Sequence, residues 1–198
     1  FISKNQLQSK EGFIALLPGS RKQELKRIIP LMAEVVRKQS NRLFGVAAVN
    51  NLDRLLYKEL TELDNAKLIF EDTYNLLLHS SAAIVTSGTA TLETALFRVP
   101  QVVVYKASSF SYLVAKRMIK VPYISLVNLI AGKQVVKELI QSDANPDSVT
   151  KELNMILTDK TYRDNMVEGY DQVIKILDTG SASENTARLM VTYLNGNN

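Results

Sequence analysis

Short apolar runs that alternate with longer helical patterns constrain the fold of this chain more than any other feature. Five runs are mostly apolar and end at polar or turn-forming residues: Phe13–Leu17, Leu43–Val49, Lys67–Phe70, Ala82–Thr86 and Val102–Tyr105. A shorter run, Tyr123–Leu126, is a candidate sixth strand. Strands with so little polar alternation are typical of a parallel sheet covered on both faces. The sequence therefore predicts an α/β fold, with a Rossmann-like, mostly parallel sheet and helices on both faces.

The segments between and after these runs have helical periodicity. From Leu25 to Val36, apolar residues recur at three- and four-residue intervals, which indicates one buried helical face. Further helices are expected at Asn51–Leu63, Tyr74–Ser80, Thr89–Phe97, Ser109–Lys120, Gln134–Gln141, Asp147–Thr158, Lys160–Leu177 and Ser183–Leu194. We interpret residues 1–142 as the sheet domain. Residues 143–198 are then a C-terminal helical extension that packs on this domain or on a partner.

The composition argues against several kinds of chemistry. The 198 residues include no cysteine and one histidine, so disulfides, thiolate catalysis and a zinc site are not expected. We expect His79 to be structural. The formal charge of +4 suits phosphorylated ligands or an anionic membrane surface. No Lys/Arg stripe with interleaved aromatic residues is present, so nucleic-acid binding is not predicted.

The sequence has no recognisable targeting signal or membrane-spanning run. No apolar run approaches the ~20 residues that cross a bilayer, and the start Phe1–Lys4 does not resemble a signal peptide. The chain also begins without Met. We interpret it as a fragment whose N-terminal portion is not included.

The loop after the first strand has features of a phosphate site. Gly19 permits close backbone approach, Ser20 offers a hydroxyl and Arg21 a forked cation. A phosphate there would meet free N–H groups at the positive end of a helix dipole. The alternative is a Pro-Gly turn with Ser20 as helix N-cap, and with Glu24 closing a capping arrangement.

The loop after the fourth strand, Ser87–Glu93, is the second candidate. Gly88 removes a side chain where a pyrophosphate would approach, and three hydroxyls surround the first helical turn. Glu93 lies about one turn into the helix, where its carboxylate could accept hydrogen bonds from a ribose diol. An N-cap with Glu93 complementing the helix dipole is the simpler alternative. Two such loops in one sheet favour a ligand that spans both.

A third segment follows the predicted sixth strand. Asn128 and Gly132 are expected just past a strand end, facing the cleft. Asn128 can equally be a turn residue that satisfies its own backbone. The pattern is neither a Walker A loop nor a Gly-x-Gly-x-x-Gly fingerprint, so ATPase and dinucleotide oxidoreductase functions lose their main support.

Five ordered motifs resemble the C-terminal half of the lipid-A-disaccharide synthase family. They are Leu16–Arg21 with Glu24, Ser87–Glu93, Pro100–Lys106, Leu113–Arg117, and Tyr123–Gly132 continuing to Val136–Gln141. The resemblance covers residues 13 to 142, with general helical similarity afterwards. The chain has Val127 where the family usually has Pro, and Lys133 where it usually has Arg. Lysine cannot provide the bidentate contacts of arginine at that position.

The resemblance implies one half of an inverting GT-B glycosyltransferase. The family transfers 2,3-diacylglucosamine from UDP-2,3-diacylglucosamine to 2,3-diacylglucosamine 1-phosphate, releasing UDP, in lipid A biosynthesis. It works as a peripheral protein at the cytoplasmic face of the inner membrane of Gram-negative bacteria. The family's N-terminal half supplies the acceptor surface and the aspartate proposed as general base. We therefore expect this chain to be inactive alone, and to require neither a metal nor another cofactor.

The resemblance also assigns the candidate residues. Ser20, Arg21 and the backbone of Gly88–Ala90 are expected at the phosphates, with Arg21 stabilising the leaving group. Glu93 is expected at the ribose, and Asn128 at the phosphates or donor sugar. The predicted substrate-binding set is Gly19, Ser20, Arg21, Ser87, Gly88, Thr89, Ala90, Thr91, Glu93 and Asn128, with Phe70, Asp72 and Gly132 as weaker candidates. Phe70 and Asp72 would serve the uracil.

The sequence is also compatible with further partners and with two other functions. The helix expected at Ser109–Lys120 could meet acyl chains and anionic headgroups, or simply pack on the core with a solvated basic side. The C-terminal helices could swap between two copies in a homodimer. The alternatives are another UDP-N-acetylglucosamine-using enzyme of this fold (a peptidoglycan glycosyltransferase or an epimerase) and a non-catalytic nucleotide-binding module.

Overall fold

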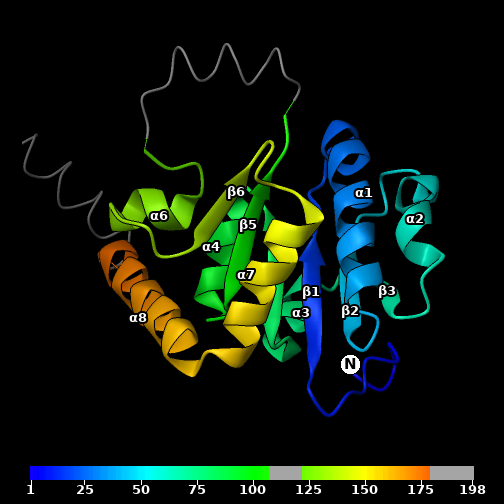
Figure 1. Ribbon diagram of the computed structural model, residues 1–198, viewed down its shortest axis with the longest axis horizontal. Coiled ribbons are helices and arrows are strands. Elements are labelled where there is room, and N and C mark those ends of the chain that lie inside the picture. Colours follow the sequence, from blue (N-terminus) through cyan, green and yellow to red (C-terminus); the bar gives the residue numbers. More distant parts are fainter. Residues whose placement is uncertain (108–121, 179–198) are drawn as a thin grey trace, which may run out of the picture.

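The computed structural model describes residues 1–107 and 122–178 and has one parallel six-stranded sheet at its centre (Figure 1). The strands are β1 (Phe13–Leu17), β2 (Leu43–Ala48), β3 (Ala66–Phe70), β4 (Ala82–Thr86), β5 (Gln101–Tyr105) and β6 (Lys137–Ile140). Their order is β3-β2-β1-β4-β5-β6, and every neighbouring pair is parallel. The predicted Rossmann-like sheet is confirmed.

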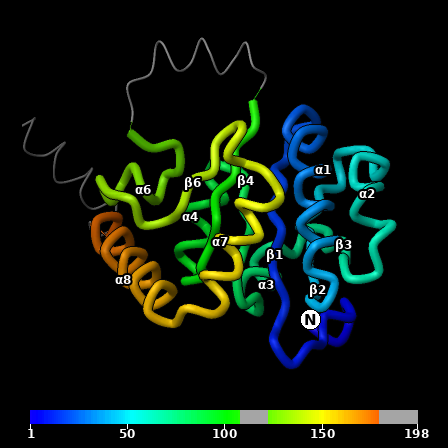
Figure 2. Tube along the Cα trace, in the orientation of Figure 1, coloured from blue at the N-terminus to red at the C-terminus, as the bar shows by residue number. Residues whose placement is uncertain are grey.

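The chain reverses its direction of travel across the sheet between β3 and β4. The first half builds outward from β1 to β3, and the second half starts on the other side of β1 and builds outward to β6, as the tube in Figure 2 traces. Strands β1 and β4 are therefore neighbours, with Leu17 paired to Val85 at their carboxyl ends. In open sheets of this kind, ligands bind outside the carboxyl ends of the strands where the strand order reverses.

Helices cover both faces of the sheet because strand side chains alternate between the faces. Ile14 and Leu16 of β1 belong to the core under α1 (Lys22–Lys38) and α7 (Pro146–Thr158). Phe13, Ala15 and Leu17 point to the other face, with α3 (Thr73–His79). In Figure 1, α1 and α7 lie in front of the sheet and α3 and α4 (Thr89–Leu96) lie behind it.

The C-terminal helices share the core with the sheet. Helix α7 buries Val149, Leu153 and Ile156, while α8 (Lys160–Leu177) buries Tyr170 and Val173, all in the cluster that contains β1 and β5. The prediction of helix Lys160–Leu177 is confirmed to the residue. None of the helices in the described ranges is both long and apolar enough to cross a membrane.

Two of the predicted elements after β5 are wrong. The predicted strand Tyr123–Leu126 is a loop that leads into α6 (Leu126–Ala131), capped by the Ser125 hydroxyl. The sixth strand lies instead within the predicted helix Gln134–Gln141, as β6. An edge strand of four residues exposes alternate side chains, so Lys137 is exposed while Leu139 is buried. Such a short pattern does not distinguish a strand from a helical turn.

The predicted helix Asn51–Leu63 is also shorter and interrupted. It consists of a 3₁₀ turn, η1 (Arg54–Tyr57), followed by α2 (Lys58–Thr61). The Asp53 side chain accepts a hydrogen bond from the Leu55 N–H and caps the 3₁₀ turn. The turn therefore begins at Arg54, three residues after the predicted start at Asn51. The helices predicted at Ser109–Lys120 and Ser183–Leu194 lie outside the described residues.

Candidate functional site

The two glycine-containing loops meet at the carboxyl edge of the sheet because β1 and β4 are adjacent. The loop after β1 leads into the N-terminus of α1, and the loop after β4 leads into the N-terminus of α4. Neither helix has a side-chain cap, whereas α6, α7 and α8 are capped by Ser125, Asn145 and Asp159. The first N–H groups of an uncapped helix have no intrahelical acceptor and are open to a ligand.

The loop after β1 is built around Gly19 and Glu24. Gly19 has φ +96°, and a Cβ there would lie 2.5 Å from Glu24 Oε2, so only glycine suits this turn. Glu24 Oε1 accepts a hydrogen bond of 3.1 Å from Arg21 Nη1. The alternative in which Ser20 is the N-cap is wrong, because the N-cap residue is Arg21 and it has no side-chain cap. Its guanidinium points to solvent, with 83% of the side chain exposed.

The loop after β4 is open above Gly88. This residue has φ +151°, and a Cβ placed on it would have no atom within 4 Å. The glycine is therefore required by its backbone conformation and leaves free space over the start of α4. The N–H groups of Thr89 and Ala90 begin this helix. The space above Gly88, next to an uncapped helix N-terminus, is suited to an anionic group.

The three hydroxyls of the second loop do not all face that space. Thr91 is fully buried and its hydroxyl donates to the Gly88 carbonyl at 2.8 Å, so its role is structural. The Ser87 hydroxyl donates to the Ile124 carbonyl at 2.9 Å, which ties the loop to the segment before α6. Thr89 alone keeps an exposed hydroxyl in the first turn of the helix.

Glu93 lies in a cavity of about 480 Å³ between α4 and the loop after β3, with Asp72 and Tyr74 among the lining residues. The structure thus brings together Asp72 and Glu93, which the sequence analysis placed at the two ends of a nucleoside. Asp72 Oδ1 accepts a hydrogen bond of 2.7 Å from Asn75 Nδ2. Phe70 does not line this cavity, and the Arg54 guanidinium lies 4.6 Å from its ring centroid.

Tyr74 is a residue of this cavity that the sequence analysis missed. It is 62% exposed, and its ring centroid lies 5.4 Å from that of Phe97. An exposed aromatic ring in the first turn of a helix at the ligand-binding edge of the sheet is the signal that could have identified it.

Asn128 is not available to a ligand, so the expectation that it contacts phosphates or a donor sugar is corrected. The side chain is completely buried. Its Oδ1 accepts from the N–H groups of Val135 (2.7 Å) and Val136 (2.9 Å). Its Nδ2 donates to the Val136 carbonyl and to Glu138 Oε1, both at 2.9 Å. These four bonds use the full hydrogen-bonding capacity of an amide.

Glu138 is a second residue that the sequence analysis missed. Besides Asn128, its carboxylate accepts from the Ile124 N–H (3.0 Å), the Ser125 N–H (2.9 Å) and the Ser125 hydroxyl (2.7 Å). It thereby fixes the segment that accepts the Ser87 hydroxyl. Glu138 is a positioning residue for the loop after β4, acting through Ile124.

Two other residues singled out from the sequence, Gly132 and His79, do not line the cavity of Glu93. Gly132 has φ +65° and ends α6 as its left-handed C-cap, which accounts for a glycine there. His79 is the last residue of α3, and its ring stacks on that of Phe1 at 5.7 Å between centroids.

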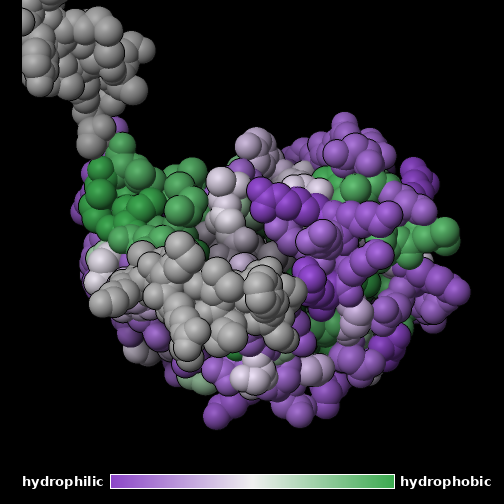
Figure 3. Space-filling model, turned by 90° about the horizontal axis from the view of Figure 1, so that it is seen from above, coloured by the Kyte–Doolittle hydropathy of each residue, from purple (hydrophilic) through white to green (hydrophobic). Residues whose placement is uncertain are grey.

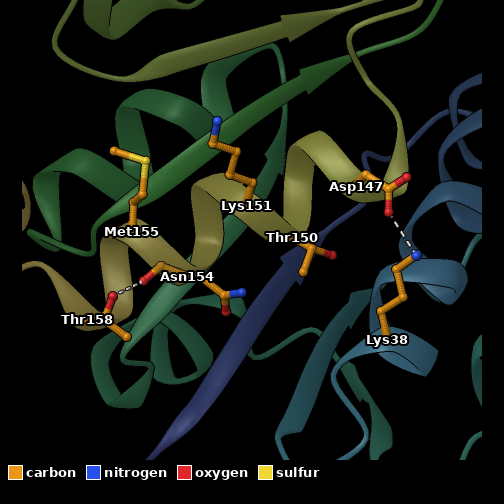
Figure 4. Close-up of a pocket in the computed structure, with 7 residues that line it drawn as sticks. All are labelled: Lys38, Asp147, Thr150, Lys151, Asn154, Met155 and Thr158. Carbon is orange, nitrogen blue, oxygen red and sulfur yellow. Dashed lines mark hydrogen bonds and ion pairs between the residues drawn. The ribbon is translucent and has the colours of Figure 1, made fainter.

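A larger hollow of about 660 Å³ lies along α7, next to the C-terminal end of α1 (Figure 4). It contains an ion pair between Lys38 Nζ and Asp147 Oδ1 at 2.8 Å, and the hydrogen bond and charge of Asp147 raise the pKa of Lys38. None of the predicted site residues lines it.

Solved structures show the same fold. S. aureus MnaA in a co-structure with UDP has a TM-score of 0.59 at 15% identity, and the match covers 98% of this chain and 47% of that one. E. coli ADP-heptose lps heptosyltransferase II has a TM-score of 0.59 at 15% identity, over 81% of this chain and 50% of that one. The described fold is that of one half of a GT-B glycosyltransferase.

Sequence relatives then identify the family. The family model described as lipid-A-disaccharide synthetase matches residues 2–190. The lipid-A-disaccharide synthase of Syntrophus aciditrophicus (strain SB) is 38% identical over 91% of this chain and 49% of its own length. That of Nitrosococcus oceani is 36% identical over 100% and 54%. The chain belongs to the lipid-A-disaccharide synthase family, and it spans about half the length of the curated relatives it matches.

Proposed function

We propose that this chain is the UDP-binding half of an inverting glycosyltransferase. The reaction transfers 2,3-diacylglucosamine from UDP-2,3-diacylglucosamine to 2,3-diacylglucosamine 1-phosphate. One observation carries the proposal: open space lies above Gly88 at the uncapped N-terminus of α4, the helix of Glu93, and β4 is the neighbour of β1, the strand that precedes the loop of Arg21. Family membership supports the choice of donor and acceptor.

The diphosphate occupies the space above Gly88 in this proposal. The diphosphate accepts hydrogen bonds from the N–H groups of Thr89 and Ala90 and from the Thr89 hydroxyl. Gly19 and Gly88 allow the backbone of their two loops to approach the diphosphate closely. Arg21 and Ser20 approach from the neighbouring loop. As the glycosidic bond breaks, negative charge grows on the β-phosphate, and donors already fixed around it lower the barrier. Protein donors neutralise this charge without a bound metal.

The nucleoside extends into the neighbouring cavity. The Glu93 carboxylate accepts hydrogen bonds from the ribose diol, as carboxylates commonly do at nucleotide sites. Asp72 lies in the same cavity, on the loop after β3, and is placed near the uracil. Phe70 stays a weaker candidate, since it does not line the cavity.

The remaining machinery belongs to the rest of the protein. We place the acceptor surface and the general base in an N-terminal half, and the whole enzyme at the cytoplasmic face of the inner membrane of a Gram-negative bacterium. The relatives are about twice as long as this chain, which supports such a division. A homodimer in which C-terminal helices are exchanged is part of the same proposal.

Calorimetry with UDP tests the binding site. The chain is expected to bind UDP, and Arg21→Ala or Glu93→Ala is expected to weaken binding by roughly tenfold, the usual worth of one lost charge-assisted hydrogen bond. Lys26→Ala, an exposed cation on α1, is the matched control and leaves the affinity unchanged. Absence of binding at millimolar UDP, or an affinity that neither variant alters, refutes the proposal.

A further inference from the structure

Gln141 directly follows β6 at the carboxyl edge of the sheet and has a left-handed backbone, with φ +53°. This conformation strains a residue other than glycine, because its Cβ lies too close to the following carbonyl oxygen. Gly19 and Gly88, in the loops after β1 and β4, also have positive φ but avoid this strain. A non-glycine residue in such a position indicates that its side chain contributes something that glycine could not.

Gln141 makes two hydrogen bonds to the end of β5, one on each side of Lys106. Its backbone N–H donates to the Tyr105 carbonyl at 2.8 Å, and its side-chain Oε1 accepts from the Ala107 N–H at 3.2 Å. The pairing of β5 with β6 ends at Tyr105 and Ile140. In a regular parallel ladder, the Ala107 N–H would donate next to the backbone carbonyl of Gln141. The side-chain carbonyl of Gln141 therefore takes the place of its own backbone carbonyl.

The segment that Gln141 holds lines a cavity at the start of α1. This cavity of about 340 Å³ is lined by residues of the first turns of α1, by Arg21, and by Tyr105, Lys106 and Ala107. Figure 3 looks onto the carboxyl edge of the sheet and shows hydrophilic surface around α1, whereas apolar surface gathers over α6. Because Arg21 is assigned to the diphosphate, the end of β5 borders the same site.

We propose that Gln141 is a positioning residue of the UDP site, which acts by holding the backbone on both sides of Lys106. Lys106 is partly enclosed and forms no ion pair with a carboxylate of the described ranges. A fixed backbone limits the directions that its side chain can take, so the ammonium group is preorganised for a diphosphate oxygen. This inference rests on the proposed function, in which the diphosphate lies beside the loop of Arg21.

The test compares the affinity for UDP, measured by calorimetry, with the thermal unfolding midpoint. Gln141→Gly keeps the left-handed backbone, relieves its strain and removes the side-chain acceptor. We expect the unfolding midpoint to stay within about 3 °C of that of the unaltered chain, while the affinity for UDP falls roughly three- to tenfold. Hydrogen exchange of the Ala107 N–H, followed by NMR, should accelerate. Gln141→Glu keeps an acceptor oxygen of the same reach and should restore the protection of this N–H.

Two further variants separate the role of Gln141 from strain and identify its route. Gln6→Gly is the matched control, because Gln6 also has a left-handed backbone, with φ +56°, but lies in a turn before β1. It relieves strain in the same way and leaves the affinity for UDP unchanged. The double variant Lys106→Ala/Gln141→Gly should bind UDP no more weakly than Lys106→Ala alone, because residues that act through one another have non-additive effects.

Two results overturn the inference and leave the proposed UDP site standing, provided that Arg21→Ala still weakens binding. One is an affinity for UDP that Gln141→Gly does not change, which would reduce the role of Gln141 to ending β6. The other is an additive loss in the double variant, which would mean that Gln141 does not act through Lys106. If the unaltered chain does not bind UDP, the proposed function and this inference fall together, so the two kinds of failure are distinguishable.

Discussion

At the scale of single residues, the structure separates side chains that are open to solvent from side chains that hold the loop. The spacing of Ser87, Gly88 and Thr91 on a short loop looks the same for both roles in the sequence. Burial and hydrogen bonding distinguish them: Thr91 is buried against the Gly88 carbonyl, whereas the space over Gly88 is empty. In the proposed site, Gly88 would contribute to binding through its missing side chain, whereas Thr91 holds the geometry of the loop.

Substitution of Gly88 tests this distinction. Gly88→Ala places a Cβ in the space proposed for the diphosphate and strains a backbone at φ +151°. We expect a loss of stability of about 1–3 kcal/mol and a loss of UDP affinity of more than tenfold, measured by denaturant unfolding and calorimetry. Gly132→Ala is the matched control, because it also has positive φ and open space but lies at the end of α6. If both variants bind UDP equally well, Gly88 does not lie at the phosphates.

At the scale of elements, β6 and α6 support a loop that they do not belong to. Glu138 on β6 binds the backbone at Ile124 and Ser125, and Ile124 accepts the Ser87 hydroxyl. The position of β6 in the sheet therefore helps to fix the loop that leads into α4. Because these contacts join segments well separated along the chain, no local pattern could have revealed them.

Removal of the Glu138 carboxylate should loosen this connection. In Glu138→Ala the Ile124 and Ser125 N–H groups lose their acceptor, so their hydrogen exchange is expected to accelerate. UDP affinity is expected to fall by a few fold through Ser87, with a loss of stability of about 1–3 kcal/mol. Glu138→Gln keeps an acceptor oxygen and should recover part of each effect. Unchanged exchange at Ile124 and Ser125 would contradict the positioning role, and Glu59→Ala on exposed surface serves as control.

At the scale of the whole molecule, the sheet is covered by helices from both ends of the described chain. Helix α8 inserts Tyr170 into the core, where its hydroxyl and the Gln101 Oε1 are buried without a hydrogen bond to the described residues. Burial raises the pKa of the Tyr170 phenol. The folded state therefore strongly favours the neutral form of this side chain.

This shift predicts the direction of pH dependence. An unfolded tyrosine ionises near pH 10, so the stability linked to Tyr170 is fully present below that pH. It is lost as the pH rises above 10 towards the higher folded pKa. We expect the thermal unfolding midpoint to fall less between pH 9 and pH 11 in Tyr170→Phe than in the unaltered chain. An equal fall in both proteins would contradict the prediction, with the exposed Tyr74→Phe as reference.

The sequence predicted the fold better than the site. Buried strands such as Ala82–Thr86 are apolar on both faces, so their pattern is strong, whereas the edge strand β6 has only a short alternating pattern. Gly19 and Gly88 both have positive φ, so the glycines in the sequence marked two sharp turns after β1 and β4. Asn128 was misassigned because a polar residue near a strand end looks the same whether it serves a ligand or a buried backbone network. Only the tertiary contacts distinguish these two cases.

In the proposed complex, UDP binds with its diphosphate above Gly88. The most direct measurement is an NMR titration of the ¹⁵N-labelled chain with UDP, followed at the backbone amides of Gly88, Thr89 and Ala90. Hydrogen bonding to a phosphate should shift these amides strongly and saturably, with smaller shifts around Glu93. Saturable shifts located elsewhere, with these three amides unchanged, would contradict the claim.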